Sequence, residues 1–364
     1  MSKKVGILTF HFGYNYGGVL QSYALQETVK NLGYDVQIIN CIPKNPLWFL
    51  IGLIRNFSWK RLYDTVRYGY KCVAGFKRFQ KQYLDCTTVV HEQNLHIIAN
   101  QFDTIIVGSD QVWNPSQHDK KIYFLNWQPE FQGIRIAYAP CCGIKRYAET
   151  NTEVLRKSLQ NFNYLSVRNE ETRAFVQQIS RIDAIKVPDP TLLYDFDKFV
   201  TNKHNTPYIL AYILGNDIDG GNQSAIEFIK SIYKDIPVIA IVLAISNPVD
   251  CSWADKIRYN VTPQEWVDLI ANAAFVYTDS FHGTLFAIKY QRSFIAYYSS
   301  KIRASRFIDL KDTYNLDNHI VSSLQKMKAK DITQPPFGNE EILTEQKAIG
   351  ISFLKKVLIN PEYF

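Results

Sequence analysis

Short runs of apolar residues alternate along most of the chain with longer segments in which apolar residues recur at helical spacing. Strands buried on both faces of a sheet are continuously apolar, and the helices that connect them are amphipathic. The alternation therefore predicts an α/β fold with parallel strands. In the first part of the chain, the expected strands are residues 5–10, 36–40, 104–107, 134–138, 164–167 and 184–187, and the expected helices are residues 19–32 and 169–179.

A second series of the same kind begins near Pro207. Thr262 and Glu265 have the spacing of a capping box, with Pro263 at the first helical position, so a helix is expected to run from there to about residue 273. Residues 340–358 predict one long helix at the end of the chain. The expected strands of this series are residues 208–214, 238–244, 275–278 and 293–297.

Two such series predict two Rossmann-like domains that face a cleft, and a length of 364 residues also favours two domains. We expect an N-terminal domain over residues 1–200, a C-terminal domain over residues 201–335 and a terminal helix over residues 336–364. In open α/β sheets, ligands bind at the carboxyl ends of the strands. Polar residues that directly follow a strand are therefore the first candidates for a functional site.

Composition excludes several classes of protein. With 46% hydrophobic residues, the chain is neither intrinsically disordered nor collagen-like. Its six cysteines show no C-x-x-C spacing, so we expect reduced, mostly buried thiols in a cytosolic protein. The sequence shows no signal-peptide pattern and no apolar run long enough to span a membrane, so neither feature is expected.

The net charge of +7 is concentrated between residues 55 and 81, where eight Lys and Arg residues accompany one acidic residue. Aromatic residues are interleaved with these charges, and we call residues 47–82 the basic-aromatic insertion. This composition is typical of elements that contact anionic membrane surfaces. A helical excursion with a buried aromatic side and a solvated basic side explains it equally well, and nucleic acid is a less favoured partner.

Four motifs place polar residues after predicted strands. The first is the loop of residues 11–18, in which Asn15, Gly17 and Gly18 precede a helix. Glycines let a ligand approach the backbone, and a helix N-terminus favours anions. The same residues are equally typical of an ordinary turn. The spacing is not G-x-G-x-x-G, so it does not predict a dinucleotide site.

The second motif follows the strand at residues 104–107 and contains Ser109, Asp110 and Asn114. Its carboxylate could orient a hydroxyl group of a ligand or cap the following turn. The third motif places Arg168 after the strand at residues 164–167. An arginine in this position could bind a carboxylate or phosphate with two hydrogen bonds, or form a surface ion pair of little energetic value with a nearby glutamate.

The fourth motif follows the strand at residues 275–278 and contains Ser280 and His282. A histidine near a helix N-terminus can act as a general acid or base. Three basic residues downstream could hold an anion, namely Lys301, Arg303 and Arg306. The chain has no phosphate-binding loop, no nucleophile elbow and no histidine spacing for zinc, so it predicts no metal site.

Taken in order, five segments resemble the polysaccharide pyruvyl transferase family: GILTFHFGYNYGGVLQSYALQ, FDTIIVGSDQVWNP, LSVRNEETR, VPDPTLLYD and TDSFHGTLFAI. They span residues 6–288. The resemblance implies a two-domain fold like that of glycosyltransferases of the GT-B type. It also implies transfer of the enolpyruvyl unit of phosphoenolpyruvate to two hydroxyls of a sugar, which gives a cyclic pyruvate ketal and phosphate. Phosphoenolpyruvate is then a co-substrate, and no cofactor is implied.

By this resemblance, His282 matches the catalytic histidine of the family, and Arg168 matches an arginine that binds the donor. Better-studied members carry Arg-x-His at the fourth motif, whereas this chain has Ser280 two residues before the histidine. We therefore expect one of Lys301, Arg303 and Arg306 to supply the missing positive charge, or the donor pocket to differ.

The acceptor is expected on the N-terminal domain, at Asn15, Gly17, Gly18, Ser109, Asp110 and Asn114. The resemblance implies a lipid-linked saccharide or polysaccharide acceptor, a role in capsule or exopolysaccharide biosynthesis, and a cytoplasmic location. The basic-aromatic insertion would then contact the inner face of the cytoplasmic membrane, and no nucleic acid is expected. Two alternatives are a nucleotide-sugar glycosyltransferase of similar fold and a non-catalytic carbohydrate-binding protein in which Ser280 marks a lost donor site.

Overall fold

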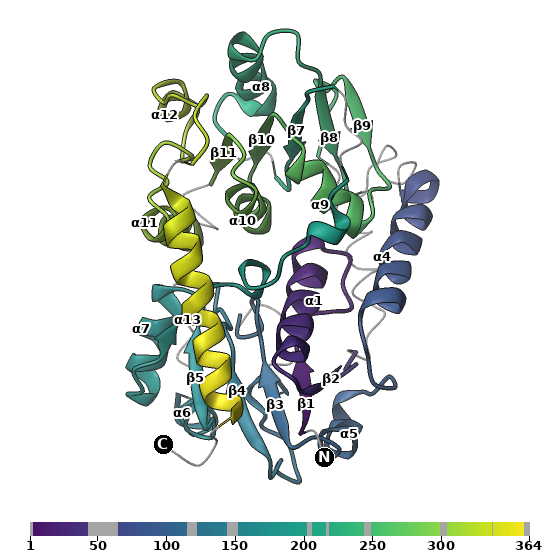
Figure 1. Cartoon of the computed structure of the whole chain (residues 1–364), viewed down its shortest axis with the longest axis vertical. Helices are drawn as coiled ribbons and strands as arrows, with labels where there is room; N and C mark the ends of the chain where they lie inside the picture. Colours follow the sequence, from purple (N-terminus) through teal and green to yellow (C-terminus); the bar gives the residue numbers. More distant parts are fainter. Residues whose placement is uncertain are drawn as a thin grey trace. The chain divides into compact units, whose positions relative to one another are not determined.

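Figure 1 shows the computed structural model of the chain, which describes residues 3–42, 65–114, 122–143, 152–201, 206–215, 218–243, 249–298, 304–336 and 338–359. Contacts divide the chain into two compact units. The first unit contains residues 1–44, 80–195 and 344–364, and the second contains residues 45–79 and 196–343. Each unit contains a parallel sheet of six strands with helices, which confirms the predicted α/β class with two Rossmann-like domains.

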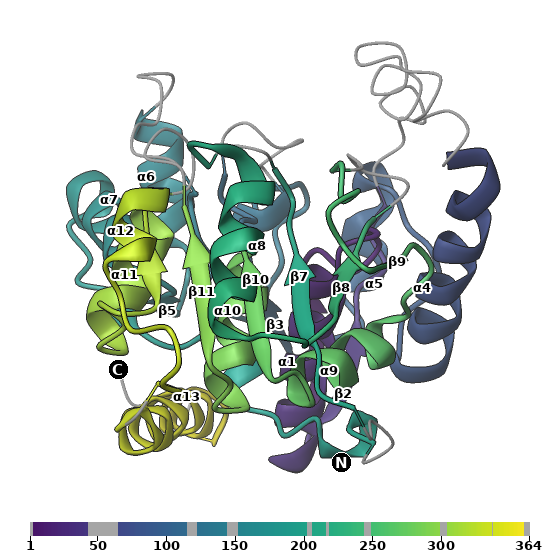
Figure 2. The same ribbon diagram turned by 90° about the horizontal axis from the view of Figure 1, so that it is seen from above.

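The first unit has the strand order β2-β1-β3-β4-β5-β6. The strands are β1 (Lys4–Leu8), β2 (Asp35–Ile38), β3 (Thr104–Val107), β4 (Ile134–Ala137), β5 (Tyr164–Val167) and β6 (Ile185–Lys186). The helices are α1 (Tyr16–Asn31), α5 (Leu95–Ala99), α6 (Thr152–Gln160), α7 (Glu170–Ser180) and α13 (Asn339–Ile359). Helices α1 and α13 lie over one face of the sheet, and α6 and α7 lie over the other (Figures 1 and 2).

The central strands of this sheet are buried on both faces, as the continuous apolar runs predict. All four residues of β3 are buried, and so are all four residues of β5. Side chains of β3 and β5 belong to one core cluster together with Leu159 of α6 and Val176 of α7. This core holds the carboxyl ends of the strands in register, where the polar residues of the second and third motifs follow.

The second unit has the strand order β12-β11-β10-β7-β8-β9, and Figure 2 shows β11, β10, β7, β8 and β9 side by side. The strands are β7 (Ile209–Tyr212), β8 (Val238–Ile241), β9 (Lys256–Arg258), β10 (Phe275–Thr278), β11 (Phe294–Tyr297) and β12 (Ile320–Val321). The helices are α8 (Gly221–Ile232), α9 (Pro263–Ala271), α10 (Phe281–Lys289), α11 (Ala304–Thr313) and α12 (Leu324–Lys328).

Alternation along β7 divides the core of the second unit between the two faces of its sheet. Ile209 and Ala211 belong to a cluster with the apolar residues of α8, whereas Tyr212 packs edge-on against Trp266 of α9, with 5.5 Å between the ring centroids. Trp266 also contacts Phe286 of α10. These contacts fix α10 in place, and α10 carries the fourth motif.

The two units differ from the expected domain boundaries at two places. Helix α13 belongs largely to the first unit, because Phe353, Leu354 and Val357 are buried and Gly350 lies close to Tyr138 and Leu193. The described residues 65–79 of the basic-aromatic insertion belong to the second unit. Residues 70–83 form helix α4 (Tyr70–Tyr83), and residues 47–64 of the insertion lie outside the described residues.

Most predicted strands are present with ends shifted by a few residues. The strand expected at residues 5–10 ends at Leu8, because the chain then turns through the polar loop that leads to α1. The short strands β9 and β12 escaped prediction, since their two or three residues are too few to show a pattern. All six cysteines lie in the described residues as thiols rather than disulfides. Within the described ranges, no helix combines the length and apolarity that a membrane crossing requires.

Candidate active site

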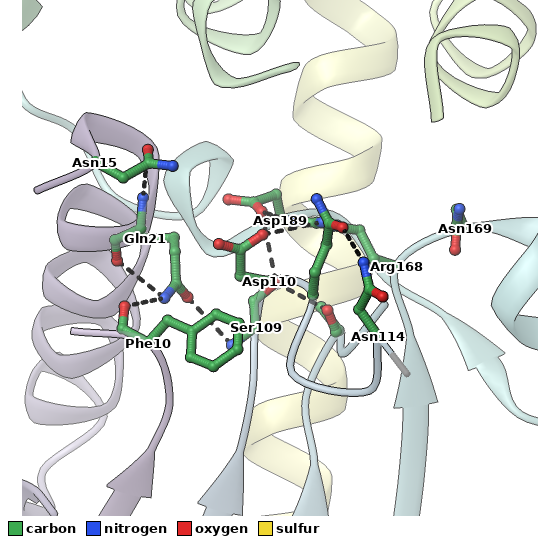
Figure 3. Close-up of polar contacts among 12 residues, drawn as sticks. Phe10, Asn15, Gln21, Ser109, Asp110, Asn114, Arg168, Asn169 and Asp189 are labelled. Carbon is green, nitrogen blue, oxygen red and sulfur yellow. Dashed lines mark hydrogen bonds and ion pairs between the residues drawn. The ribbon is translucent and has the colours of Figure 1, made fainter. Parts of the chain in front are cut away.

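Polar side chains gather at the carboxyl ends of three strands in the first unit. Asp110 follows β3, Arg168 follows β5, and Asp189 follows β6. Parallel strands end at the same edge of a sheet, so these residues from distant parts of the sequence come together (Figure 3). The structure thus unites the second and third motifs.

Arg168 is the centre of this cluster. Its Nη1 lies 2.8 Å from Oδ2 of Asp189, and its Nη2 lies 3.3 Å from Oδ1 of Asp110. The side chains of Arg168 and Asp189 are almost completely buried. We call Arg168, Asp110 and Asp189 the carboxylate–arginine cluster. It contains two carboxylates and one guanidinium, so its net charge is negative.

The ionisation of Arg168 reflects these neighbours. Burial by itself lowers the pKa of Arg168, but nearby Cys141, Asp110 and Asp189 together outweigh it and raise the pKa above its ordinary value. The guanidinium therefore keeps its charge inside the protein. A buried charge of this kind is tolerated only when it is paired and hydrogen-bonded.

Asp189 was not among the predicted site residues. Its Oδ1 accepts hydrogen bonds from the backbone nitrogen and from Oγ1 of Thr191, and its Oδ2 accepts from Arg168. The Oγ of Ser109 is a further, more distant donor at 3.5 Å. Asp189 is thus a fixed anchor for the arginine. Its position after a strand between two prolines is the signal that would have identified it.

Asp110 has one anchored oxygen and one open oxygen. Oδ1 pairs with Arg168, whereas Oδ2 accepts no hydrogen bond within the part of the chain that the structure describes. Oδ2 lies 3.9 Å from the point that a Cβ on Gly18 would occupy, so it is close to the first turn of α1. The backbone φ of Asp110 is 70°, a left-handed value that is uncommon outside glycine and concentrates at functional sites.

A hydrogen-bond chain ties α1 to the loop after β3. Gln21 donates through Nε2 to Oγ1 of Thr9 at 2.9 Å and accepts through Oε1 from the backbone nitrogen of Ser109 at 3.1 Å. Thr9 in turn donates to the backbone oxygen of Ser109. Gln21, which the sequence analysis missed, therefore sets the position of the residue next to Asp110 (Figure 3). Ser109 itself is directed inward and donates to the backbone oxygen of Ala139.

The other predicted acceptor residues make contacts that stabilise the protein itself. Asn15 caps α1 by accepting a hydrogen bond from the backbone nitrogen of Gly18, and Gly17 is buried in the first turn. Asn114 donates to Oε1 of Gln111. The neighbour of the cluster arginine, Asn169, caps α7 through its oxygen, while its buried Nδ2 has no hydrogen-bond partner within the described residues. Asn169 stands apart from the cluster in Figure 3.

In the second unit, His282 lies in the first turn of α10, directly after β10. It is buried, with 7% of its surface exposed, and its ring meets that of Phe281 edge-on at 5.3 Å. Ser280 precedes it as the N-cap and accepts a hydrogen bond from the backbone nitrogen of Gly283. His282 therefore belongs to the first turn of a helix, where the backbone nitrogens favour negative charge.

The position after His282 has no room for a side chain, which is why glycine occupies it. A Cβ at this position would lie 2.6 Å from Oγ1 of Thr278. That oxygen cannot move away without loss, because it donates to the backbone oxygen of Tyr212 and accepts from the backbone nitrogen of Ser280. The His-Gly pair thus allows α10 to start tightly against the end of β10.

Of the three basic residues expected near the fourth motif, only Arg306 lies in the described residues. Its guanidinium lies 5.7 Å from the ring centroid of Phe281, next to His282 in the sequence. Lys301 and Arg303 lie outside the described residues. Among the described residues there is also no group of three or more side chains that could hold a metal ion.

Solved structures share the fold at low sequence identity. The UDP-GlcNAc 2-epimerase of Methanocaldococcus jannaschii has 12% identity and a TM-score of 0.51, over 95% of this chain and 98% of that one. The UDP-GlcNAc 2-epimerase of Neisseria meningitidis, bound to UDP-GlcNAc, has 9% identity and a TM-score of 0.52, over 99% and 98%. A sucrose-phosphate synthase of Thermosynechococcus elongatus has 12% identity and a TM-score of 0.52, over 96% and 97%.

No curated protein sequence matches the chain. The sequence model of the polysaccharide pyruvyl transferases, in contrast, matches residues 15–301, which include the first turn of α1, the carboxylate–arginine cluster and His282. The match therefore covers strands of both sheets, residues 15–18 of the first motif and the whole of the other three motifs. On this basis the chain belongs to the polysaccharide pyruvyl transferase family.

Proposed function

We propose that this protein transfers the enolpyruvyl unit of phosphoenolpyruvate to two hydroxyls of a sugar in a surface-polysaccharide precursor. The products are a cyclic pyruvate ketal and phosphate. The observation that carries the proposal is that one family match includes both a buried histidine at a helix start and an arginine-held carboxylate at a sheet edge. The histidine suits protonation of the donor, and the carboxylate suits removal of a proton from the sugar hydroxyl.

His282 is proposed to act on the donor. Phosphoenolpyruvate needs a proton at its methylene carbon, which creates an electron-poor carbon that a hydroxyl can attack. An imidazole can deliver such a proton near neutral pH. The N-terminal turn of α10 supports the negative charges of the donor, because its backbone nitrogens point toward that end of the helix.

Asp110 is proposed to receive the acceptor sugar. A carboxylate oxygen that is held in place and has no protein partner can accept a hydrogen bond from a hydroxyl and remove its proton as the new bond forms. Oδ2 of Asp110 meets this description within the described residues. The net negative charge of its cluster favours a neutral hydroxyl over a phosphate at this point.

This geometry changes the role expected for Arg168. Both terminal nitrogens of its guanidinium already bind carboxylates. We propose that Arg168 is a positioning residue, which holds Asp110 in place through an ion pair, rather than the ligand of the donor phosphate. Arg306 is the described cation beside the fourth motif, and we propose that it takes part of the charge that other family members place two residues before the histidine.

The proposed reaction balances without any further reactant. The methylene carbon gains one proton, two carbon–oxygen bonds form to the sugar, and the carbon–oxygen bond to phosphate breaks. Of the two protons that leave the sugar hydroxyls, one restores the acid and the other leaves with the phosphate. No oxidant or reductant is needed.

The test is acceptor-dependent release of phosphate from phosphoenolpyruvate with a panel of lipid-linked and synthetic galactosides. His282→Gln is expected to reduce kcat by about 10²-fold or more, the usual contribution of a general acid or base. Asp110→Asn is expected to do the same while leaving the binding of phosphoenolpyruvate intact. Asp183→Asn, in an exposed ion pair with Arg173, is the matched control and should retain full activity.

Retention of activity in the folded His282→Gln protein would contradict the proposed role of the histidine. Binding of phosphoenolpyruvate without turnover would point to a different acceptor sugar. Absence of both binding and turnover in the wild type would contradict the donor assignment itself and would indicate that Ser280 marks a changed site.

A nucleotide-sugar glycosyltransferase is the second candidate, because the similar structure from Neisseria meningitidis is bound to UDP-GlcNAc. This alternative predicts that UDP raises the melting temperature of the protein and that phosphoenolpyruvate does not. A non-catalytic carbohydrate-binding protein would instead bind sugar equally well with and without His282.

A further inference from the structure

Helix α4 makes up most of the described part of the basic-aromatic insertion, and the proposed reaction makes no use of it. It appears as the blue helix labelled α4 in Figure 1. One side of α4 is buried through Cys72, Gly75, Phe76 and Phe79. Phe79 packs on Phe199 with 5.9 Å between the ring centroids, and a Cβ on Gly75 would touch Thr262. These contacts hold α4 firmly by its apolar side.

The opposite side of α4 is a basic face. Its exposed side chains recur at helical spacing and are Tyr70, Lys71, Lys77, Arg78, Lys81 and Gln82. Residues three, four or seven apart share one side of a helix, so Tyr70, Lys77 and Lys81 lie in one row. Tyr70 is 80% exposed, which is unusual for so large an aromatic residue.

The charge on this face is not compensated. Helix α4 contains no Asp or Glu, and within the described residues its four exposed cations form no ion pair. Other exposed cations of this protein do find acidic partners: Arg173 pairs with Asp183, Lys230 with Asp255 and Lys347 with Asp195. Four neighbouring cations that lack such partners strongly attract a negatively charged surface.

We propose that the basic face of α4 docks this protein on an anionic lipid membrane. A membrane of this kind presents a dense layer of negative phosphates, which matches a row of cations on a rigid helix. The exposed ring of Tyr70 supports this partner, because tyrosine suits the boundary between headgroups and hydrocarbon, where one end of the side chain is apolar and the other is hydrated. The inference is independent of the reaction proposed above.

The test is co-sedimentation of the full chain with vesicles of phosphatidylcholine that contain phosphatidylglycerol, and with vesicles of phosphatidylcholine alone. The wild type is compared with the quadruple variant Lys71→Gln, Lys77→Gln, Arg78→Gln and Lys81→Gln. Each cation near an anionic surface contributes about fivefold to binding. The quadruple variant is therefore expected to bind anionic vesicles at least about tenfold more weakly, and Tyr70→Ser more weakly than the wild type by a smaller factor.

The matched control has the same change of net charge on other elements: Lys234→Gln, Lys256→Gln, Lys328→Gln and Lys355→Gln, all at exposed positions. It should bind like the wild type, and all variants should keep the circular dichroism and melting temperature of the wild type. Equal loss in the control would overturn the proposal, since it would show that net charge alone matters. Wild-type binding to neutral vesicles as strong as to anionic ones would also overturn it. Tighter binding to duplex DNA than to anionic vesicles, lost in the quadruple variant, would replace the membrane with nucleic acid as the partner.

Discussion

At the scale of single residues, the main feature of this protein is the buried carboxylate–arginine cluster. Arg168 neutralises part of the charge of Asp189, which is almost completely buried, and of Asp110, which is largely buried. Only Oδ1 of Asp110 pairs with the arginine. Removal of the arginine therefore changes both the stability of the protein and the position of Asp110.

Arg168→Gln is expected to destabilise the protein by about 3–5 kcal/mol, because it leaves two buried carboxylates without their cation. Arg173→Gln, which breaks an exposed ion pair, is the control and should change stability little. Urea denaturation of both variants measures the difference. Equal midpoints for the two variants would contradict the view that Arg168 is a buried structural cation.

His11 is a buried histidine in the loop before α1. One ring nitrogen lies 3.0 Å from the backbone oxygen of Thr9, and the other lies 3.0 Å from Oδ1 of Asn40. Burial lowers the pKa of His11, and these two bonds only partly oppose the effect. His11 is thus a buried core histidine that supports the loop before α1.

At the scale of elements, helix starts organise both groups of candidate residues. Asn15 caps α1, Asn169 caps α7 and Ser280 caps α10, each by accepting a hydrogen bond from a backbone nitrogen in the first turn. In each case, the polar residue that follows the strand caps the next helix. Any role of Ser280 at the donor is additional to this structural one.

Ser280→Ala is expected to lower the free energy of unfolding by about 1 kcal/mol, the usual value of an N-cap. Ser280→Thr keeps an oxygen at the same place and should remain close to the wild type. Thermal denaturation compares the two variants. If both retain the stability of the wild type, Ser280 is not needed as a cap, and its place in the motif must be explained by ligand binding alone.

At the scale of the whole molecule, the chain returns to its first unit after completing the second. Helix α13 brings Phe353, Leu354, Val357 and Leu358 into the core beside the first sheet. The terminal residues therefore stabilise strands that lie more than two hundred positions earlier in the sequence.

Leu354→Ala is expected to cost about 2–5 kcal/mol and to act mainly on the first unit. Hydrogen exchange should become faster in β1 and β3 and stay unchanged in β7 and β10, because Leu354 belongs to the first unit. Lys355→Ala, at an exposed neighbouring position, is the control. Equal acceleration in both sheets would show that the two units unfold together.

The predicted strands at residues 104–107, 164–167 and 275–278 match β3, β5 and β10 without any shift. Each is a continuous apolar run between polar breaks, and such a run predicts a buried strand without information from the rest of the chain. The capping box at Thr262 is likewise local and is present as predicted. The edge strand β9, with two charged residues among its three, has no such signal.

The candidate site was predictable only in part. Asp110 and Arg168 could be singled out because each directly follows an apolar strand. Asp189 and Gln21 were missed, since their roles depend on hydrogen bonds to a side chain 21 residues away and to a backbone nitrogen 88 residues away. The sequence left open whether Arg168 binds an anionic ligand or a nearby glutamate; in the structure its two terminal nitrogens bind the carboxylates of Asp110 and Asp189.

Local apolar patterns and short motifs were enough to predict the fold class, the positions of most strands along the chain, the family and the residues that stand at strand ends. Which of these residues meet, which oxygen of Asp110 pairs with Arg168 and which side of α4 faces solvent follow from the three-dimensional structure alone. Hydrogen bonds, ion pairs and burial join residues that are far apart along the chain, so no local pattern records them.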